Sequence, residues 1–213
     1  ALLPEQELQF YSLIDLAHAY SILGYYGDRK YYAYADKYYR QLLDINPVIT
    51  VAYQDYGRMK LWQGDFVAAR ELFLRGIEVV PDLSKAMPGS EHTITLTRQL
   101  AYFHDLIGLS YYNEKNYEMA RPEFEKAISI DPNLSSSIKK LADIAYQEGN
   151  KKVAIEYNMK GYVIEPNNAL WPLGLALIYK EENNISAARR YAKEGFALDP
   201  QNEQLKNLVK ELQ

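Results

Sequence analysis

The stretch ISIDPN, residues 128–133, decides the fold because close copies of it recur along the chain. The copies are LLDINP at 42–47, IEVVPD at 77–82, YVIEPN at 162–167 and FALDPQ at 196–201. The prolines are separated by 34, 51, 34 and 34 residues, so one interval exceeds the others by 17 residues. A fixed period of this length is the signature of stacked structural repeats. The sequence therefore predicts five units, with an insertion between the second and the third.

Small side chains recur within the period and predict where two helices cross. An alanine stands at the same distance before each proline, as Ala35, Ala69, Ala120, Ala154 and Ala188. Turn pairs such as Gly64-Asp65 lie near the middle of the units, where Gly ends one helix and Asp caps the next. Each proline is expected to end the second helix, because its ring cannot continue the hydrogen-bond ladder. Each unit is thus predicted to be a helix, a turn and a second helix.

This pattern resembles the tetratricopeptide repeat, a helix–turn–helix unit of the same length. The third unit carries most of the resemblance, in Ile107, Gly108, Tyr111, Ala120, Phe124, Ala127 and Pro132. The resemblance covers residues 5–200 and implies an all-α fold, a right-handed α-solenoid of five helix–turn–helix units with a C-terminal capping helix. The predicted single domain, 1–213, has units at about 5–47, 50–83, 101–134, 135–168 and 169–202, an insert at 83–100 and a capping helix at 202–212.

The first unit departs from this pattern. Strict register places the bulky Leu23 where other units have a small residue. A first helix that uses Leu13, Leu16, Ala17 and Tyr20 fits better, followed by about six extra residues around GYYGDRK, residues 24–30. We therefore expect a longer first helix and a longer turn in this unit.

The resemblance also implies a binding surface, because the first helix of each tetratricopeptide unit lines a concave groove. The residues expected to contact a partner there are Gln54, Arg58, Trp62, Tyr102, Asp105, Leu109, Tyr112, Lys139, Asp143, Tyr146, Leu173 and Leu177. Some family members clamp the C-terminal carboxylate of chaperones with Lys and Asn, and this chain has other residues at those places. The mixture of aromatic, aliphatic and charged side chains suits a peptide with apolar anchors. Part of the tyrosine surface is expected to pack against neighbouring helices.

The insert contains AMPGSEHTITLT, residues 86–97, and allows two interpretations. In the first, MPGSEH is a loop, and Ser90 or Thr97 caps an N-terminal extension of the third unit's first helix. In the second, the alternating TITLT is an extended strand that folds over the groove or recruits a partner. Five residues of alternation are a weak strand signal, so the sequence favours the helical extension.

The composition argues against several kinds of site. The net charge is −4 and no block of five basic residues occurs, so nucleic-acid binding is not expected. No apolar run has the length of a membrane span, and cysteine is absent, which excludes disulfides and thiolate metal sites. His18, His92 and His104 lack metal-site spacing, and His104 is expected to be a structural residue in or near the core. We expect no catalytic residue, no metal and no cofactor.

These observations predict a non-catalytic scaffold that binds a peptide or protein segment in a groove rich in tyrosine, of which the chain has 20. One alternative is self-association through the apolar fifth unit or the insert. Another is a soluble regulatory tail of a larger membrane enzyme, since the long first unit, the insert and the missing initiator Met are similar to the repeat tails of bacterial O-antigen-ligase-like membrane proteins. Sugar binding by the groove is a further interpretation without a motif. The sequence leaves the compartment open, cytoplasmic or extracytoplasmic.

Overall fold

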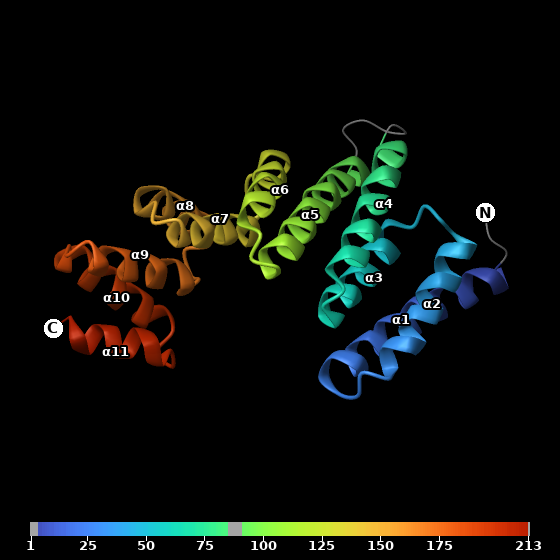
Figure 1. Ribbon diagram of the computed structural model, residues 1–213, viewed down its shortest axis with the longest axis horizontal. Helices are drawn as coiled ribbons and strands as arrows, with labels where there is room; N and C mark the ends of the chain where they lie inside the picture. Colours follow the sequence, from blue (N-terminus) through green and yellow to red (C-terminus); the bar gives the residue numbers. More distant parts are fainter. Residues whose placement is uncertain (1–3, 85–90, 213) are drawn as a thin grey trace. The chain divides into compact units, whose positions relative to one another are not determined.

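A computed structural model describes residues 4–84 and 91–212, and all regular structure in these ranges is α-helical (Figure 1). The helices form antiparallel pairs joined by short turns, as the 34-residue period predicts. The chain divides into two compact units, the N-terminal unit up to Ile130 and the C-terminal unit from Asp131. The prediction of one domain over 1–213 stays a prediction.

In its described residues, the N-terminal unit has six helices, namely α1 (Pro4–Tyr26), α2 (Tyr31–Ile45), α3 (Thr50–Gln63), α4 (Phe66–Ser84), α5 (Glu91–Asn113) and α6 (Tyr117–Ile130). Successive helices pack on one another, and the first helices α1, α3 and α5 also contact each other in sequence order. Glycines allow the closest approaches. A Cβ added to Gly57 would lie 2.2 Å from the Phe73 ring, so only glycine lets α3 and α4 pack at this distance.

Over residues 131–212, the C-terminal unit has five helices, namely α7 (Ser135–Gln147), α8 (Lys151–Ile164), α9 (Leu170–Glu181), α10 (Ile185–Leu198) and α11 (Glu203–Glu211). The helix α11 confirms the predicted capping helix. Its start is fixed by the Asn202 side chain, which accepts hydrogen bonds from the backbone N–H groups of Gln204 and Leu205, each at 3.1 Å. Leu205 and Leu208 are buried against the last repeat.

Two expectations for the first unit have different outcomes. The first helix, with 23 residues, is longer than α3, α7 and α9, as predicted, and equals α5, which includes part of the insert. Leu13 and Ala17 are buried on it, whereas Leu16 is exposed. The longer turn is confirmed only in part, because α1 continues to Tyr26 and α2 begins at Tyr31, which leaves a turn of four residues against two or three in the other units. The extra residues are helical since Gly24 supplies the small side chain at the crossing, where an added Cβ would lie 2.6 Å from the Tyr32 ring.

The helical interpretation of the insert is confirmed from Glu91 onward. Residues 93–97 lie inside α5, so the extended-strand interpretation of TITLT is wrong. Thr97 does not cap this helix either, because the helix begins earlier. The expected cap at Ser90 lies outside the described residues.

The prediction that each proline ends a second helix holds at four of the five repeats. The helices α2, α6, α8 and α10 each end two residues before their proline. At Pro81 the prediction is wrong, since α4 runs to Ser84. A proline lacks only its own N–H donor, so the residues that follow it can still donate to carbonyls one turn earlier.

Within the described ranges, no helix combines the length and the apolar composition needed to cross a membrane.

Candidate functional site

In the N-terminal unit, Arg58 is at the centre of the residues predicted to contact a partner. Its guanidinium carbon lies 5.5 Å from the centroid of the Trp62 ring, which places the cation over the aromatic face. Trp62 packs in turn on Tyr25 of α1, with 4.7 Å between the ring centroids. Arg58, Trp62 and Gln54 are all half-buried on α3. A partner can therefore reach one side of an aromatic and cationic surface that the helices already hold in place.

An acidic residue outside the predicted set, Asp55, supports Arg58. Its Oδ1 lies 3.6 Å from Nη1 of Arg58, and its Oδ2 lies 3.9 Å from Nδ1 of His18 on α1. Burial raises the pKa of Asp55, while Arg58 and His18 oppose that rise. The spacing of Asp55 and Arg58 along α3 was the sequence signal for this pair, because side chains three residues apart are neighbours on a helix.

The residues of the predicted set that lie on α5 are half-buried or buried. Tyr102 is half-buried, and its pKa is raised mainly by burial, with Arg58 lowering it and the carboxylates of Asp105 and Asp55 raising it. Asp105 is buried, with 5% of its surface exposed. Leu109 packs against the core of α3, α4 and α5, and the Tyr112 ring lies 5.4 Å from that of Tyr117.

The C-terminal unit brings another part of the predicted set together on α7. Lys139 and Asp143 form an ion pair one helical turn apart. One turn further along, the hydroxyl of Tyr146 donates a hydrogen bond to Glu181 at the end of α9. The carboxylate of Glu181 also lies 3.1 Å from Nζ of Lys151 on α8. These polar contacts join α7, α8 and α9 at one edge of the surface.

A cavity of about 240 Å³ opens on this surface. It is lined by Lys139, Ala142, Asp143, Tyr146 and Gln147 of α7, Asn158 of α8, and Gly174, Leu177 and Ile178 of α9. Four of these residues were predicted from the repeat pattern. Leu173, also predicted, is buried in the core between α9, α10 and α11.

Asn158 and Gly174 were not predicted. Asn158 lies on a second helix, whereas the groove positions were carried over for first helices only. The sequence did indicate that Asn158 is unusual, because three other units have an aromatic residue at the same distance before their proline. These residues are Tyr39, Phe73 and Phe124.

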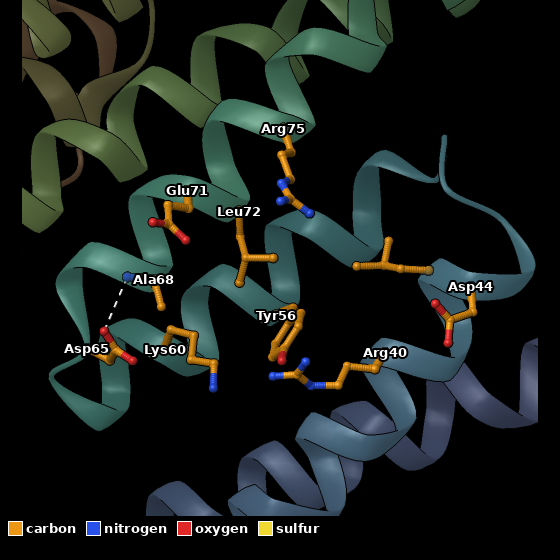
Figure 2. A pocket seen from close by; sticks show the side chains of 10 residues that line it. Arg40, Asp44, Tyr56, Lys60, Asp65, Ala68, Glu71, Leu72 and Arg75 are labelled. Carbon is orange, nitrogen blue, oxygen red and sulfur yellow. Dashed lines mark hydrogen bonds between the residues drawn. The ribbon is translucent and has the colours of Figure 1, made fainter.

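A larger cavity, of about 430 Å³, lies in the N-terminal unit between α2, α3 and α4 (Figure 2). None of the predicted partner-contacting residues lines it. Its lining consists of Arg40, Leu43, Asp44, Tyr56, Lys60, Asp65, Ala68, Glu71, Leu72 and Arg75. Figure 2 shows Arg75 reaching toward it from α4 and Arg40 from α2. Charges of both signs surround this cavity, so its electrostatics select no single class of ligand.

One wall of the larger cavity is held by Asp36 of α2. Oδ1 of Asp36 accepts hydrogen bonds from the Tyr56 hydroxyl at 2.5 Å and from Nζ of Lys60 at 2.7 Å, and Oδ2 accepts from Nε of Arg40 at 2.7 Å. Burial alone would raise the pKa of Asp36, but these three hydrogen bonds outweigh it and lower the pKa to about 2. Tyr56 and Lys60 belong to α3, so the carboxylate ties two successive repeats together.

His104 is buried, with 4% of its surface exposed, and its Nδ1 lies 2.7 Å from Oε2 of Glu123 on α6. The pair joins the two helices of the third repeat, which confirms the structural interpretation of this histidine. Among the residues that the structure describes, no group of three His, Cys, Asp or Glu side chains could hold a metal ion.

Comparisons with known proteins agree with this architecture. Residues 101–134 match the family model of the tetratricopeptide repeat. A search of curated proteins found no match to the sequence.

Solved structures resemble most of the chain. YrrB, a tetratricopeptide-repeat protein with an unusual peptide-binding site, has a TM-score of 0.61 at 13% identity, over 84% of this chain and 83% of that one. PilF from Pseudomonas aeruginosa has a TM-score of 0.65 at 19% identity, over 92% and 80%. PilW, a type IV pilus biogenesis factor, has a TM-score of 0.54 at 14% identity, over 98% and 100%. The chain therefore has the all-α fold of tetratricopeptide-repeat proteins.

Proposed function

We propose that this chain, in which residues 101–134 are a tetratricopeptide repeat and the other helix pairs share that fold, is a non-catalytic interaction scaffold. Its ligand would be a peptide or protein segment, bound within a unit on the surface that the first helices of that unit form. The name inner surface denotes, in each unit, the residues expected to contact a partner. They are Gln54, Arg58 and Trp62 of α3 and Tyr102, Asp105, Leu109 and Tyr112 of α5 in the N-terminal unit, and Lys139, Asp143 and Tyr146 of α7 and Leu173 and Leu177 of α9 in the C-terminal unit.

The observation that carries this proposal is the cavity on α7 and α9. Lys139, Asp143, Tyr146 and Leu177 were expected from the resemblance to the tetratricopeptide repeat, and they line one cavity of about 240 Å³. A cavity with apolar walls and a few polar groups at its mouth is the usual form of a binding site. It accommodates an anchoring side chain, and such anchors supply most of the binding free energy of a peptide interface.

The N-terminal unit supports the same function with different chemistry. The half-buried Trp62 offers an aromatic surface, and Arg58 and Asp55 offer charges that hold one another in position. Tryptophan, tyrosine and arginine are the residues that most often dominate interfaces. YrrB, which shares the fold, is described as having a peptide-binding site.

The test is a selection of random peptides displayed on phage against the whole chain, followed by fluorescence measurement of the dissociation constants. The variant Tyr112→Ala/Tyr146→Ala removes one aromatic ring from the inner surface of each unit. We expect it to bind the selected peptides about tenfold more weakly or worse, since a buried aromatic anchor is worth more than 1 kcal/mol. The control is Val163→Ala, because Val163 is 78% exposed on α8 and does not line the cavity.

Helical content measured by circular dichroism should be nearly the same in the wild type and both variants. Selected peptides that bind the double variant as tightly as the wild type would place the site elsewhere. A library that yields no binder of the wild type would contradict peptide binding itself.

A further inference from the structure

We infer that the cavity on α7, α8 and α9 is a pocket for an aromatic side chain that carries a hydrogen-bond donor at its tip, a tyrosine or tryptophan of a partner peptide. Oδ1 of Asn158 is the group that accepts the hydrogen bond. This inference rests on the proposed function and specifies which side chain the C-terminal unit recognises.

The cavity exists because asparagine replaces an aromatic residue in the fourth repeat. At the same place in the period, Tyr39, Phe73 and Phe124 are almost fully buried and fill the space between the two helices of their units. Phe73 and Phe124 do so against the glycines Gly57 and Gly108. In the fourth repeat, the shorter Asn158 takes the place of the aromatic residue and Ala142 takes the place of the glycine, and both line the cavity.

The amide of Asn158 has a defined orientation. Its Nδ2 donates a hydrogen bond to the carbonyl of Ala154 at 2.8 Å, and the opposite orientation would set two oxygens against each other. Only 3% of the residue is exposed, and no described residue donates a hydrogen bond to Oδ1. Buried acceptors in folded proteins nearly always have a partner, so an unpaired acceptor on a residue that lines a cavity is suited to a donor from outside.

Gly174 of α9 makes room for this acceptor. A Cβ added to Gly174 would lie 2.4 Å from Oδ1 of Asn158, and no real side chain tolerates that distance. Glycine inside a helix is unfavourable compared with alanine, so its presence here needs a local reason. The asparagine and the glycine together form a polar site from two helices, and each residue requires the other.

The volume of the cavity and the side chains that line it limit the kinds of ligand that it can bind. Its volume of about 240 Å³ lies below the roughly 300–1,000 Å³ of sites for drug-sized ligands, which favours a single side chain over a cofactor. Ala142, Leu177 and Ile178 offer apolar contacts, so the ligand needs an apolar body. Tyrosine and tryptophan combine such a body with one donor and few rotatable bonds. A lysine would bring its ammonium close to Lys139, whose ion pair already uses the Asp143 carboxylate.

The first experiment titrates the whole, isotopically labelled chain with N-acetyl-tyrosinamide, N-acetyl-tryptophanamide and N-acetyl-phenylalaninamide. In nuclear magnetic resonance spectra, we expect shifts of the Asn158 side-chain amide and of the Ala142 and Ile178 backbone amides. The tyrosine and tryptophan amides should bind about tenfold more tightly than the phenylalanine amide, because phenylalanine leaves the buried acceptor unpaired. This preference should disappear in Asn158→Leu and persist in the control Val163→Ala.

Two controls distinguish a loss of ligand preference from a folding defect of the variant. Leucine has nearly the shape of asparagine and removes a buried acceptor that lacks a hydrogen-bond donor, so Asn158→Leu should unfold at or above the wild-type temperature. Gly174→Ala closes the same site from α9 and should also remove the preference. Equal binding of all three amides by the wild type, or no shifts at the cavity, would overturn the inference.

The experiments distinguish a failure of the aromatic pocket from a failure of the proposed function. Phage-selected peptides that lose affinity in Tyr112→Ala/Tyr146→Ala but bind Asn158→Leu normally would leave that function standing and overturn the aromatic pocket. If no peptide is selected but the tyrosine amide binds with Asn158-dependent preference, the pocket stands and peptide binding by the inner surface fails.

Discussion

At the scale of single residues, the repeat depends on small side chains where two helices cross. Ala35, Ala69, Ala120, Ala154 and Ala188 are all fully buried, and each lies on the second helix of its unit. A methyl group is the largest side chain that such a crossing accepts without moving the backbones apart. The sequence showed this register because the same steric need recurs in every unit.

Replacement of Ala120 by leucine tests the register directly. Ala120 is 0% exposed on α6, so the extra carbon atoms must displace neighbours in a close-packed core. We expect the free energy of unfolding to fall by about 1–3 kcal/mol, as is typical of overpacked cores. Chemical denaturation measures the change. The neighbouring Met119 is 45% exposed, so Met119→Leu is a control that should change stability by less than about 0.5 kcal/mol. An Ala120→Leu chain as stable as the wild type would count against the register.

The residues of the candidate site were predictable to different degrees. Lys139, Asp143 and Tyr146 could be predicted because the resemblance to the tetratricopeptide repeat carries the groove positions of that family onto the first helix of the unit. Asn158 could not be found in this way. Its Oδ1 has no hydrogen-bond donor, and Gly174, which leaves room for that oxygen, lies on another helix. The Asp36 cluster was missed for the same reason, since it joins residues of α2 and α3 across a repeat boundary.

At the scale of helices, the contact between two successive repeats, called a joint below, is stabilised by more than apolar packing. The turn after α2 contains Pro47, and the next repeat begins with Thr50. The Asp36 carboxylate fixes the two helices further by accepting hydrogen bonds from Tyr56 and Lys60 of α3. Charged hydrogen bonds of this kind are stronger than neutral ones and depend on the ionisation of the acid.

The pH dependence of stability should show how much the Asp36 carboxylate stabilises the joint between α2 and α3. The pKa of Asp36 is about 2 in the folded chain against an ordinary value of 3.8, so the folded state binds its proton less tightly than the unfolded state. Its contribution to stability is therefore present above the ordinary value and is lost as the pH falls toward 2. The shift corresponds to about 2 kcal/mol, since one pKa unit is worth about 1.4 kcal/mol.

Asp36→Asn keeps the shape of the side chain and removes the charge. We expect the difference in unfolding free energy between wild type and Asp36→Asn to be about 2 kcal/mol at pH 7 and to shrink between about pH 5 and pH 2. Urea denaturation at a series of pH values measures this difference, and the titrations shared by both chains cancel in it. A difference that stays constant over this range would show that the charge of Asp36 does not stabilise the joint.

At the scale of the whole molecule, the chain contains two compact units, and each has a core of its own. In the C-terminal unit, Leu175 and Ala192 of the last repeat are fully buried in a cluster that includes Leu205 and Leu208 of α11. A terminal repeat would otherwise expose its apolar face, so a capping helix is required. The amphipathic spacing of α11 was visible in the sequence. The division at Ile130 was not, because the repeat period continues across it unchanged.

The core of the C-terminal unit predicts that residues 131–213 fold when they are expressed alone. We expect helical circular dichroism and one cooperative thermal transition for this fragment. A matched fragment, 131–202, lacks α11 and loses the burial of Leu205, Leu208 and Leu212. At about 1.5–3 kcal/mol for each buried leucine, this loss is comparable with the whole stability of a small domain, so the shorter fragment should be largely unfolded. Two fragments of equal stability would show that α11 does not cap the core. A longer fragment without a cooperative transition would show that residues 131–213 need the first 130 residues to fold.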